Sequence, residues 1–448
     1  MKQLLLSLTL IAFILSCTNT GRQAPSRLEH QVDSLVQPFL DSAKMAGMAV
    51  AVYKGDEKLI SKNYGFADLE FDVALPENAS FEIGSITKQF TGVSILLLAE
   101  EGKLSLDDEL TKYITYNTKG RKITIRQLLS HTSGIKSYTS LPNFEYLSQQ
   151  HHSRDTLLRI LEKEGYDFEP GEMLHYNNSA FFMLGLIIEK VGGVAYEEFV
   201  KKNLFDKAGM NNSYYCSESK IIKNKSHGYD TGEDGLVHAA YLDHTWPYAA
   251  GSLCSTAEDL VKWNQALHHG KILSDASYKE FLTPVTLGDG TLTHYAKGIS
   301  VTNIDGRRMI EHGGGINGFL SENCYYPDED LSVVVLVNTT GPVSPSDVAV
   351  QITNFVMGKP ARQSAQFEGD ASKFIGSYKS DMFNVEITKN DTTISVKYSY
   401  ADRPPYPLYF MEDNTWSSGP SLYHFIEKDG VIDELRIDQT YGYYVLKK

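Results

Sequence analysis

The sequence predicts a domain that mixes helices with an antiparallel sheet, followed by a second, smaller domain of antiparallel strands. An amphipathic helix over residues 28–43 precedes two short strands at 47–53 and 58–64, which are joined by a turn. A helix that leads into a hairpin argues against a doubly wound parallel sheet. The segments 85–101 and 178–191 are apolar nearly all round, as in helices that lie inside a core.

Size and charge narrow the class of protein. With 448 residues, the chain is long enough for two or three domains. Hydrophobic residues make up 42% and charged residues 22%, as in ordinary globular proteins, so wholesale disorder is excluded. The formal net charge is −14 and no run of basic residues stands out, so no nucleic-acid partner is expected.

The N-terminal residues have the pattern of an export signal. The apolar run 4–15 is too short to span a bilayer but fits the hydrophobic region of a signal peptide. The segment that ends at Cys17 is similar to a bacterial lipoprotein cleavage box. We therefore expect residues 1–16 to be removed, Cys17 to be lipidated, and residues 17–27 to tether the protein to a membrane of the bacterial cell envelope. Ordinary signal cleavage is the alternative.

The remaining elements follow from local composition. Residues 256–269 are predicted as a capped surface helix and 333–337 as a buried strand. We expect the first domain to cover 28–357, a linker to cover 358–366, and an all-β domain that holds nine of the 27 tyrosines to cover 367–448. The strands expected in that domain are Asn384–Lys389, Thr392–Tyr398, Tyr406–Met411, Tyr423–Glu427, Val431–Asp438 and Tyr443–Lys447.

Three cysteines lie beyond Cys17, namely Cys216, Cys254 and Cys324. Three thiols cannot all pair within one chain. One disulfide is possible, but buried free thiols are the favoured interpretation. Neither the cysteines nor the histidines show metal-ligand spacing, so no metal site and no cofactor are expected.

Ser85 and Lys88 form the first candidate for chemistry. Residues three apart share one face of a helix, so the hydroxyl and the amine are brought together. A serine becomes a nucleophile when a base takes its proton, and a lysine with a lowered pKa can do this. Of the Ser-x-x-Lys pairs in the sequence, only this one lies at the start of a predicted buried helix. The alternative is that Ser85 only caps that helix. Two other pairs have the same spacing, Ser133/Lys136 and Ser217/Lys220.

Tyr176 and Asn178 form the second candidate, because they immediately precede the second buried helix. A phenol near a lysine ammonium is biased toward phenolate and can act as a general base. The carboxamide can hydrogen-bond a substrate amide. The alternative is that Asn178 caps the helix and Tyr176 packs in the core.

The third candidate is the run Glu311-His312-Gly313-Gly314-Gly315. Glycines let a strand edge approach a substrate closely, and their backbone N–H groups can point at a developing oxyanion. No phosphate-loop pattern accompanies them. The alternative is a glycine-rich turn with a surface histidine.

Taken together, these motifs resemble the serine β-lactamase and penicillin-binding protein superfamily, specifically its class C-like branch of DD-peptidases, D-aminopeptidases and esterases. The resemblance covers about residues 28–357 and includes the stretches 125–135 and 250–260. It implies an α/β fold with an antiparallel sheet flanked by helices, an all-α subdomain, and an active site between them. The C-terminal β domain resembles the small barrel-like appendages of some of these hydrolases.

The resemblance also implies a role for each motif residue. Ser85 would be the acylated nucleophile and Lys88 its proton partner. Tyr176 would be the base that also protonates the leaving group, and Asn178 would orient the substrate. The backbone N–H groups of Ser85 and Gly315 would form the oxyanion hole.

His312 marks a departure from the class C β-lactamases, which keep a Lys-Thr-Gly at this place. An unperturbed imidazole, with a pKa of about 6.5, is only a conditional partner for a substrate carboxylate. Together with Gly314 and Gly315, it is expected to contact substrate. The predicted function is a serine acyl hydrolase of the cell envelope that acts on D-amino-acid peptides or small esters. The alternatives are a β-lactamase, or an envelope sensor or scaffold with slow turnover.

Overall fold

The computed structural model describes residues 26–217, 219–304, 306–359, 367–380, 382–389, 393–399, 404–419 and 421–448. The predicted signal peptide, Cys17 and nearly all of the tether lie outside the described residues, as does the linker from residue 360 onward. The predicted domain boundaries stay predictions.

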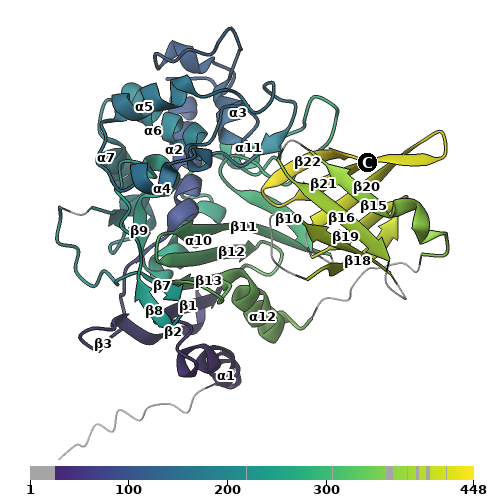
Figure 1. Cartoon of the computed structure of the whole chain (residues 1–448). Coiled ribbons are helices and arrows are strands. Elements are labelled where there is room, and N and C mark those ends of the chain that lie inside the picture. The colour runs from purple at the N-terminus through teal and green to yellow at the C-terminus, as the bar shows by residue number, and fades with distance from the viewer. Residues whose placement is uncertain are drawn as a thin grey trace, which may run out of the picture.

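A seven-stranded antiparallel sheet forms the centre of the molecule (Figure 1), with the strand order β10-β11-β12-β13-β1-β2-β3. β1 (Gly47–Lys54) pairs on one side with β13 (Leu331–Val337) and on the other with β2 (Glu57–Asp68). The predicted hairpin is confirmed, and all the strand pairs of this sheet are antiparallel, as expected. The other strands are β10 (Ser300–Ile304), β11 (Arg307–Ile316), β12 (Phe319–Tyr326) and β3 (Val73–Ala74).

Helices cover both faces of this sheet because its middle strands are apolar on both sides. In β1, Ala49 and Ala51 face one core while Val50 and Val52 face the other, as the two-residue period of a strand requires. The helices of the first core are α2 (Thr87–Glu100) and α10 (Ala257–His268), and those of the second are α1 (Arg27–Asp41) and α12 (Pro345–Met357).

A helical region lies beside the sheet and includes α6 (Asn178–Gly192), which packs against α2. Every residue of α2 from Thr87 to Leu98 is buried, which confirms the prediction from its all-round apolarity. The remaining α-helices are α3 (Ile125–Leu129), α4 (Phe144–Leu147), α5 (Arg154–Lys163), α7 (Tyr196–Val200), α8 (Asp206–Ala208), α9 (Tyr248–Gly251) and α11 (Asp275–Phe281). Within the described ranges, no single helix is long and apolar enough to cross a membrane; only the bent pair Asn178–Gly192 and Tyr196–Ala208 passes that test together, with a 75° bend between its halves.

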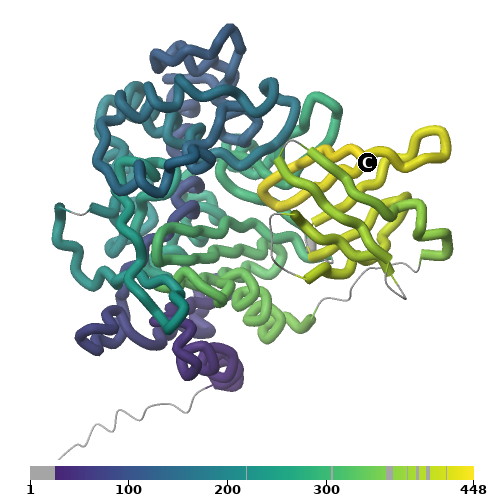
Figure 2. Tube along the Cα trace, viewed as in Figure 1, coloured from purple at the N-terminus to yellow at the C-terminus, as the bar shows by residue number. Residues whose placement is uncertain are grey.

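The C-terminal strands close into an eight-stranded antiparallel barrel, seen at the yellow end of the chain in Figure 2, because its first strand pairs with its last. The barrel has a core of its own, centred on Phe374, Trp416 and Leu435. The six predicted strands are confirmed, whereas the short strands β15 and β19 were missed. The strands are β15 (Gly376–Lys379), β16 (Asn384–Lys389), β17 (Ile394–Tyr398), β18 (Tyr406–Glu412), β19 (Thr415–Ser418), β20 (Ser421–Lys428), β21 (Val431–Gln439) and β22 (Gly442–Lys447).

The barrel is joined to the helical region through a shared pair of strands. β5 (Leu174–His175), which directly precedes Tyr176, pairs antiparallel with β22, so that His175 lies opposite Gly442. The segment that carries a candidate catalytic residue is therefore held by the barrel as well as by α6.

Two small sheets complete the fold. In one, β9 (Leu253–Ser255) lies between β4 (Phe81–Glu82) and β6 (Tyr214–Tyr215). The other contains β7 (Tyr229–Gly232), β8 (Gly235–His238) and β14 (Thr339–Thr340).

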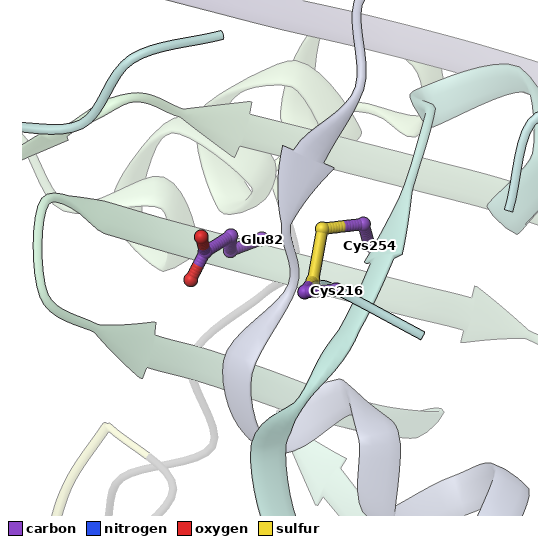
Figure 3. A group of neighbouring side chains, drawn as sticks. All are labelled: Glu82, Cys216 and Cys254. Atoms are coloured by element: carbon purple, nitrogen blue, oxygen red, sulfur yellow. A yellow bond between two sulfur atoms is a disulfide. The ribbon is translucent and has the colours of Figure 1, made fainter. Parts of the chain in front are cut away.

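The small sheet around β9 explains a correction to the cysteine prediction. Cys216 and Cys254 form a disulfide, and Cys324 is a buried free thiol, so the expectation of free thiols holds for one residue only. The pairing of β6 with β9 brings the two cysteines together. Figure 3 shows Glu82 beside this disulfide. Because the two sulfur atoms are bonded to each other, they are not thiolate ligands, and Glu82 instead pairs with Lys225 at 3.1 Å and His244 at 3.3 Å.

Candidate active site

Ser85 lies in the tight turn that leads into α2. Residues Gly84–Ile86 form one turn of 3-10 helix, and α2 follows directly. One turn further along, Nζ of Lys88 donates a hydrogen bond to Oγ of Ser85 over 3.0 Å. The structure thus brings the predicted hydroxyl and amine together at the start of a buried helix.

The amine of Lys88 is completely buried. Besides Ser85, its Nζ donates hydrogen bonds to Oδ1 of Asn178 over 2.8 Å and to the backbone oxygen of Ala250 over 2.9 Å. These partners are neutral, and burial lowers the pKa of Lys88 well below its ordinary value. An amine with a lowered pKa is more readily unprotonated, and in that form it can accept the proton of Ser85.

Asn178 is free to bind Lys88 because its neighbour caps the helix. The side chain of Asn177 accepts a hydrogen bond from the backbone N–H of Ala180 over 2.8 Å and so caps α6. Asn178 is the first residue inside α6, and its own N–H donates to Oγ of Ser137 over 3.2 Å. The alternative that Asn178 serves as the cap is therefore wrong.

Tyr176 packs over the same amine, with Nζ of Lys88 lying 4.7 Å from its ring centre. Its hydroxyl is buried and makes no hydrogen bond to a described residue. Burial raises the pKa of Tyr176 far above its usual range, and the nearby Ser85 hydroxyl offsets this only in part. The expected bias toward phenolate is therefore wrong, since burial disfavours the charge. Tyr176 is a neutral phenol that can pass on a proton.

Glycines allow β11 to lie against the Ser85 turn. A Cβ atom on Gly314 would lie 2.1 Å from the backbone oxygen of Ile83, and one on Gly84, whose φ is +50°, would lie 2.9 Å from the backbone nitrogen of Gly315. Any side chain at these positions would force the two segments apart. The backbone N–H of Gly315 is thus held beside Ser85, an arrangement suited to an oxyanion hole.

His312 does not reach the substrate side, which corrects its assignment as a substrate contact. The side chain is 1% exposed; its Nδ1 donates to the backbone oxygen of Gly313 over 2.6 Å, and its Nε2 accepts from the Tyr295 hydroxyl over 2.9 Å. Burial, helped by nearby Lys88, lowers the pKa of His312 to about 3. At neutral pH the imidazole is therefore uncharged and enclosed, and it cannot serve as a cation for a substrate carboxylate.

A cleft of about 600 Å³ opens in front of Ser85. Glu145 and Asp230 are the charged side chains among the described residues that line it, and that lining holds no lysine, arginine or histidine. The cleft therefore presents negative charge to a ligand. Its lining consists of Ser85, Tyr138, Thr139, Phe144, Glu145, Ser148, Gln149, Asn178, Asp230, Ala240, Leu242, Pro247, Ala250, Gly251, Gly315, Ile316, Asn317, Leu320 and Thr340.

Sequence reasoning missed residues that pack against the candidate catalytic groups. His131 lies with its ring centre 4.4 Å from that of Tyr176, and its Nδ1 accepts the backbone N–H of Asn177 over 3.1 Å. Tyr441, from the barrel, has its ring centre 5.8 Å from that of Tyr176 and 5.1 Å from that of His312. These contacts join distant parts of the chain, so no local pattern could have indicated them, although His131 belongs to the stretch 125–135 that the resemblance includes.

This geometry supplies the parts of acyl transfer, namely a serine hydroxyl, a desolvated amine, a phenol and converging backbone amides. A family model described as Beta-lactamase matches residues 32–354. The chain belongs to the Beta-lactamase family. The match contains Ser85, Lys88, Tyr176 and Asn178, whereas the barrel lies beyond its end.

Members of this family and related folds are similar to the chain over different lengths. Penicillin-binding protein 4* of Bacillus subtilis is 29% identical over 307 residues, which cover 64% of this chain and 67% of that protein. The D-stereospecific amidohydrolase from Streptomyces sp. is 25% identical, with a TM-score of 0.63 and coverage of 74% of this chain and 99% of that one. The octameric penicillin-binding protein homologue from Pyrococcus abyssi is 23% identical, with a TM-score of 0.66, and it covers 93% of this chain and 99% of its own.

Proposed function

We propose that the protein is a serine acyl hydrolase that forms an acyl-enzyme on Ser85. The observation that carries this proposal is the 3.0 Å hydrogen bond between the Ser85 hydroxyl and the fully buried amine of Lys88. In acylation, Lys88 acts in its unprotonated form: its lone pair accepts the hydroxyl proton of Ser85 while Oγ attacks the acyl carbon. The backbone N–H groups of Ser85 and Gly315 bind the negative charge that develops on the acyl oxygen, and each such donor is typically worth ~10²–10³ in rate.

Tyr176 completes the proton path in this proposal. Its neutral phenol gives a proton to the leaving group as the bond to the acyl carbon breaks, and it recovers one from the protonated Lys88. A water molecule then attacks the acyl carbon and gives a proton to Lys88 or Tyr176. The bond between the acyl carbon and Oγ breaks, Oγ takes up that proton, and the acid product leaves.

We propose that the preferred acyl donors are uncharged or cationic, such as D-amino-acid peptides or amides with a free amine, or small esters. Glu145 and Asp230 in the cleft favour a positive ligand, and His312 is too enclosed to attract a carboxylate. The likeness to a D-stereospecific amidohydrolase agrees with this class of substrate. A cephalosporin, which carries a carboxylate, is expected to be a poor substrate.

We also propose that the protein acts in the bacterial cell envelope, exported by residues 1–16 and held on a membrane through a lipid on Cys17. The export-type pattern of the sequence supports this location. The Cys216–Cys254 disulfide agrees with it, because disulfides persist in oxidising compartments.

The test is turnover on a panel of p-nitrophenyl esters, D-amino-acid amides, D-Ala-D-Ala peptides and a chromogenic cephalosporin. Intact-protein mass after a fluorophosphonate should rise by one adduct on the peptide that holds Ser85. The Ser85→Ala variant should lose both the adduct and turnover, while Ser133→Ala, in the second Ser-x-x-Lys pair, should keep both. An adduct that persists in Ser85→Ala, or a wild type without turnover on any member of the panel, would overturn the proposal.

A further inference from the structure

We infer that Tyr441, carried by the C-terminal barrel, is a positioning residue of the active site that aligns the β11 edge for acylation. The inference rests on the proposed function, but it concerns a residue beyond the stretch 32–354 that matches the family. Tyr441 lies in the two-residue turn between β21 and β22, where Gln439 pairs with Gly442.

The hydroxyl of Tyr441 makes two hydrogen bonds, both to β11. It donates to Oε2 of Glu311 over 2.5 Å and accepts the backbone N–H of Gly313 over 2.9 Å. Both contacts lie in the strand that carries Gly315. One hydroxyl therefore fixes a side chain and a backbone group on the same short stretch of strand.

The sheet leaves this stretch without a neighbouring strand on one side, while β12 pairs with it on the other. β10 pairs with β11 only as far as Ser300 opposite Glu311, so the β10-facing edge of β11 is open beyond that point. In an antiparallel strand, the N–H groups of alternate residues point to the same edge, and those of Gly313 and Gly315 belong to this open edge. The Tyr441 hydroxyl takes the place of the next ladder partner at Gly313. The N–H of Gly315, two residues further, remains for the substrate.

The hairpin that carries Tyr441 is itself fixed to the catalytic loop. Gly442 pairs with His175 in β5, and the Tyr441 ring packs near the rings of Tyr176 and His312. Tyr441 thus contacts the two sides of the site, the strand of Gly315 and the loop of Tyr176. It is not among the residues that line the cleft in front of Ser85.

The test compares Tyr441→Phe with Tyr443→Phe in the full-length protein. Tyr443 is two residues away, and its hydroxyl contacts Thr291 at 3.2 Å and Arg436 at 3.4 Å, so Tyr443→Phe removes a hydroxyl from the same junction without touching β11. We expect Tyr441→Phe to lower kcat for a p-nitrophenyl ester, and the rate of fluorophosphonate labelling at Ser85, by about 10–100-fold, with KM changed less than about two-fold. Tyr443→Phe should keep both rates within about two-fold of wild type.

Hydrogen exchange provides a readout that does not depend on turnover. The Gly313 amide loses its acceptor in Tyr441→Phe, so the peptide containing residues 311–316 should exchange faster in that variant but not in Tyr443→Phe. Wild-type rates and wild-type exchange in Tyr441→Phe would overturn the inference, as would equal losses of activity in the two variants. A wild type without turnover would overturn the proposed function instead, and the exchange comparison would still decide whether Tyr441 holds β11.

Discussion

Nζ of Lys88 donates a hydrogen bond to Oδ1 of Asn178 over 2.8 Å and so joins the first turn of α2 to the first residue of α6, ninety residues further along the chain. Because Asn177 caps α6, the carboxamide of Asn178 is available to hold the amine. The amine is thereby kept against Ser85, no carboxylate of the described residues forms an ion pair with it, and its pKa stays low. This arrangement determines which groups of the site carry a proton before acylation.

Replacing Lys88 with arginine should lower the acylation rate by about 10²–10⁴-fold, since a guanidinium keeps its proton and cannot act as the base. Burial lowers the pKa of Lys88, so the wild-type rate should be highest above that pKa and fall as the pH drops through it. The measurement is kcat/KM for an uncharged ester against pH. Lys136→Arg, in the second Ser-x-x-Lys pair, is the matched control and should behave as wild type. Retained activity in Lys88→Arg would contradict the role of the amine.

Tyr176→Phe should lower the chemical rate by about 10²–10⁴-fold with little change in melting temperature. The hydroxyl has no hydrogen-bond partner among the described residues, so its removal leaves no polar group unpaired. Single-turnover kinetics and a thermal melt on the same preparation test both halves of this expectation. Unchanged turnover would mean that Tyr176 only packs in the core.

Asp230→Asn should raise kcat/KM for an anionic ester relative to a neutral one by about two- to five-fold, because interactions of partly exposed charges are typically worth ~0.2–1 kcal/mol. The difference should shrink in high salt. Asp234→Asn, which removes the same charge from an exposed turn outside the cleft, is the control and should leave the ratio unchanged. Equal ratios in the two variants would contradict the electrostatic account of substrate choice.

His312→Lys should destabilise the protein and should not create a carboxylate site. A lysine at this position would be buried near Lys88 and would lose the contacts that His312 makes with Gly313 and Tyr295. Cephalosporin turnover in the wild type should also show no rise toward pH 6, because His312 does not take up a proton there. A melting temperature equal to that of wild type, with faster cephalosporin turnover, would restore the substrate-contact assignment.

Glu311→Gln should flatten the dependence of stability on pH. Burial raises the pKa of Glu311 to about 7. Burial and the neighbouring Glu311 raise the pKa of Glu322, which lies on β12 opposite Gly313, well above its ordinary value. A carboxyl whose pKa is higher in the folded protein contributes stability that is complete below the unfolded value, near 4.5, and is lost as the pH rises through about 7.

The wild-type melting temperature should therefore fall between pH 5 and pH 8, and that of Glu311→Gln should fall less, since glutamine keeps an acceptor for Tyr441 but has no charge to bury. Some slope should remain from Glu322 and from Asp438, whose pKa burial raises to about 7. Identical slopes in the two proteins would rule out Glu311 as the group responsible.

Short-range features of the fold and site could be predicted from sequence, whereas the features that depend on distant pairing could not. The spacing of Ser85 and Lys88 is set by one helical turn, and the apolar runs of α2 and α6 follow from their own residues. The Cys216–Cys254 disulfide depends on the pairing of β6 with β9, which no local pattern reports. The burial of His312, and with it the loss of its charge, comes from Tyr295 and from the barrel residue Tyr441.

The pairing of β5 with β22 also limits where the C-terminal barrel can be exchanged between related proteins. The predicted linker covers residues 358–366, but β5, which precedes it by far in the chain, is a strand of the barrel's sheet. A chimera joined at the predicted linker would keep β5 but would lose the β21–β22 hairpin, whose second strand pairs with β5. Swapping the barrel for that of a relative should therefore preserve activity only when Leu174 and His175 are exchanged along with it.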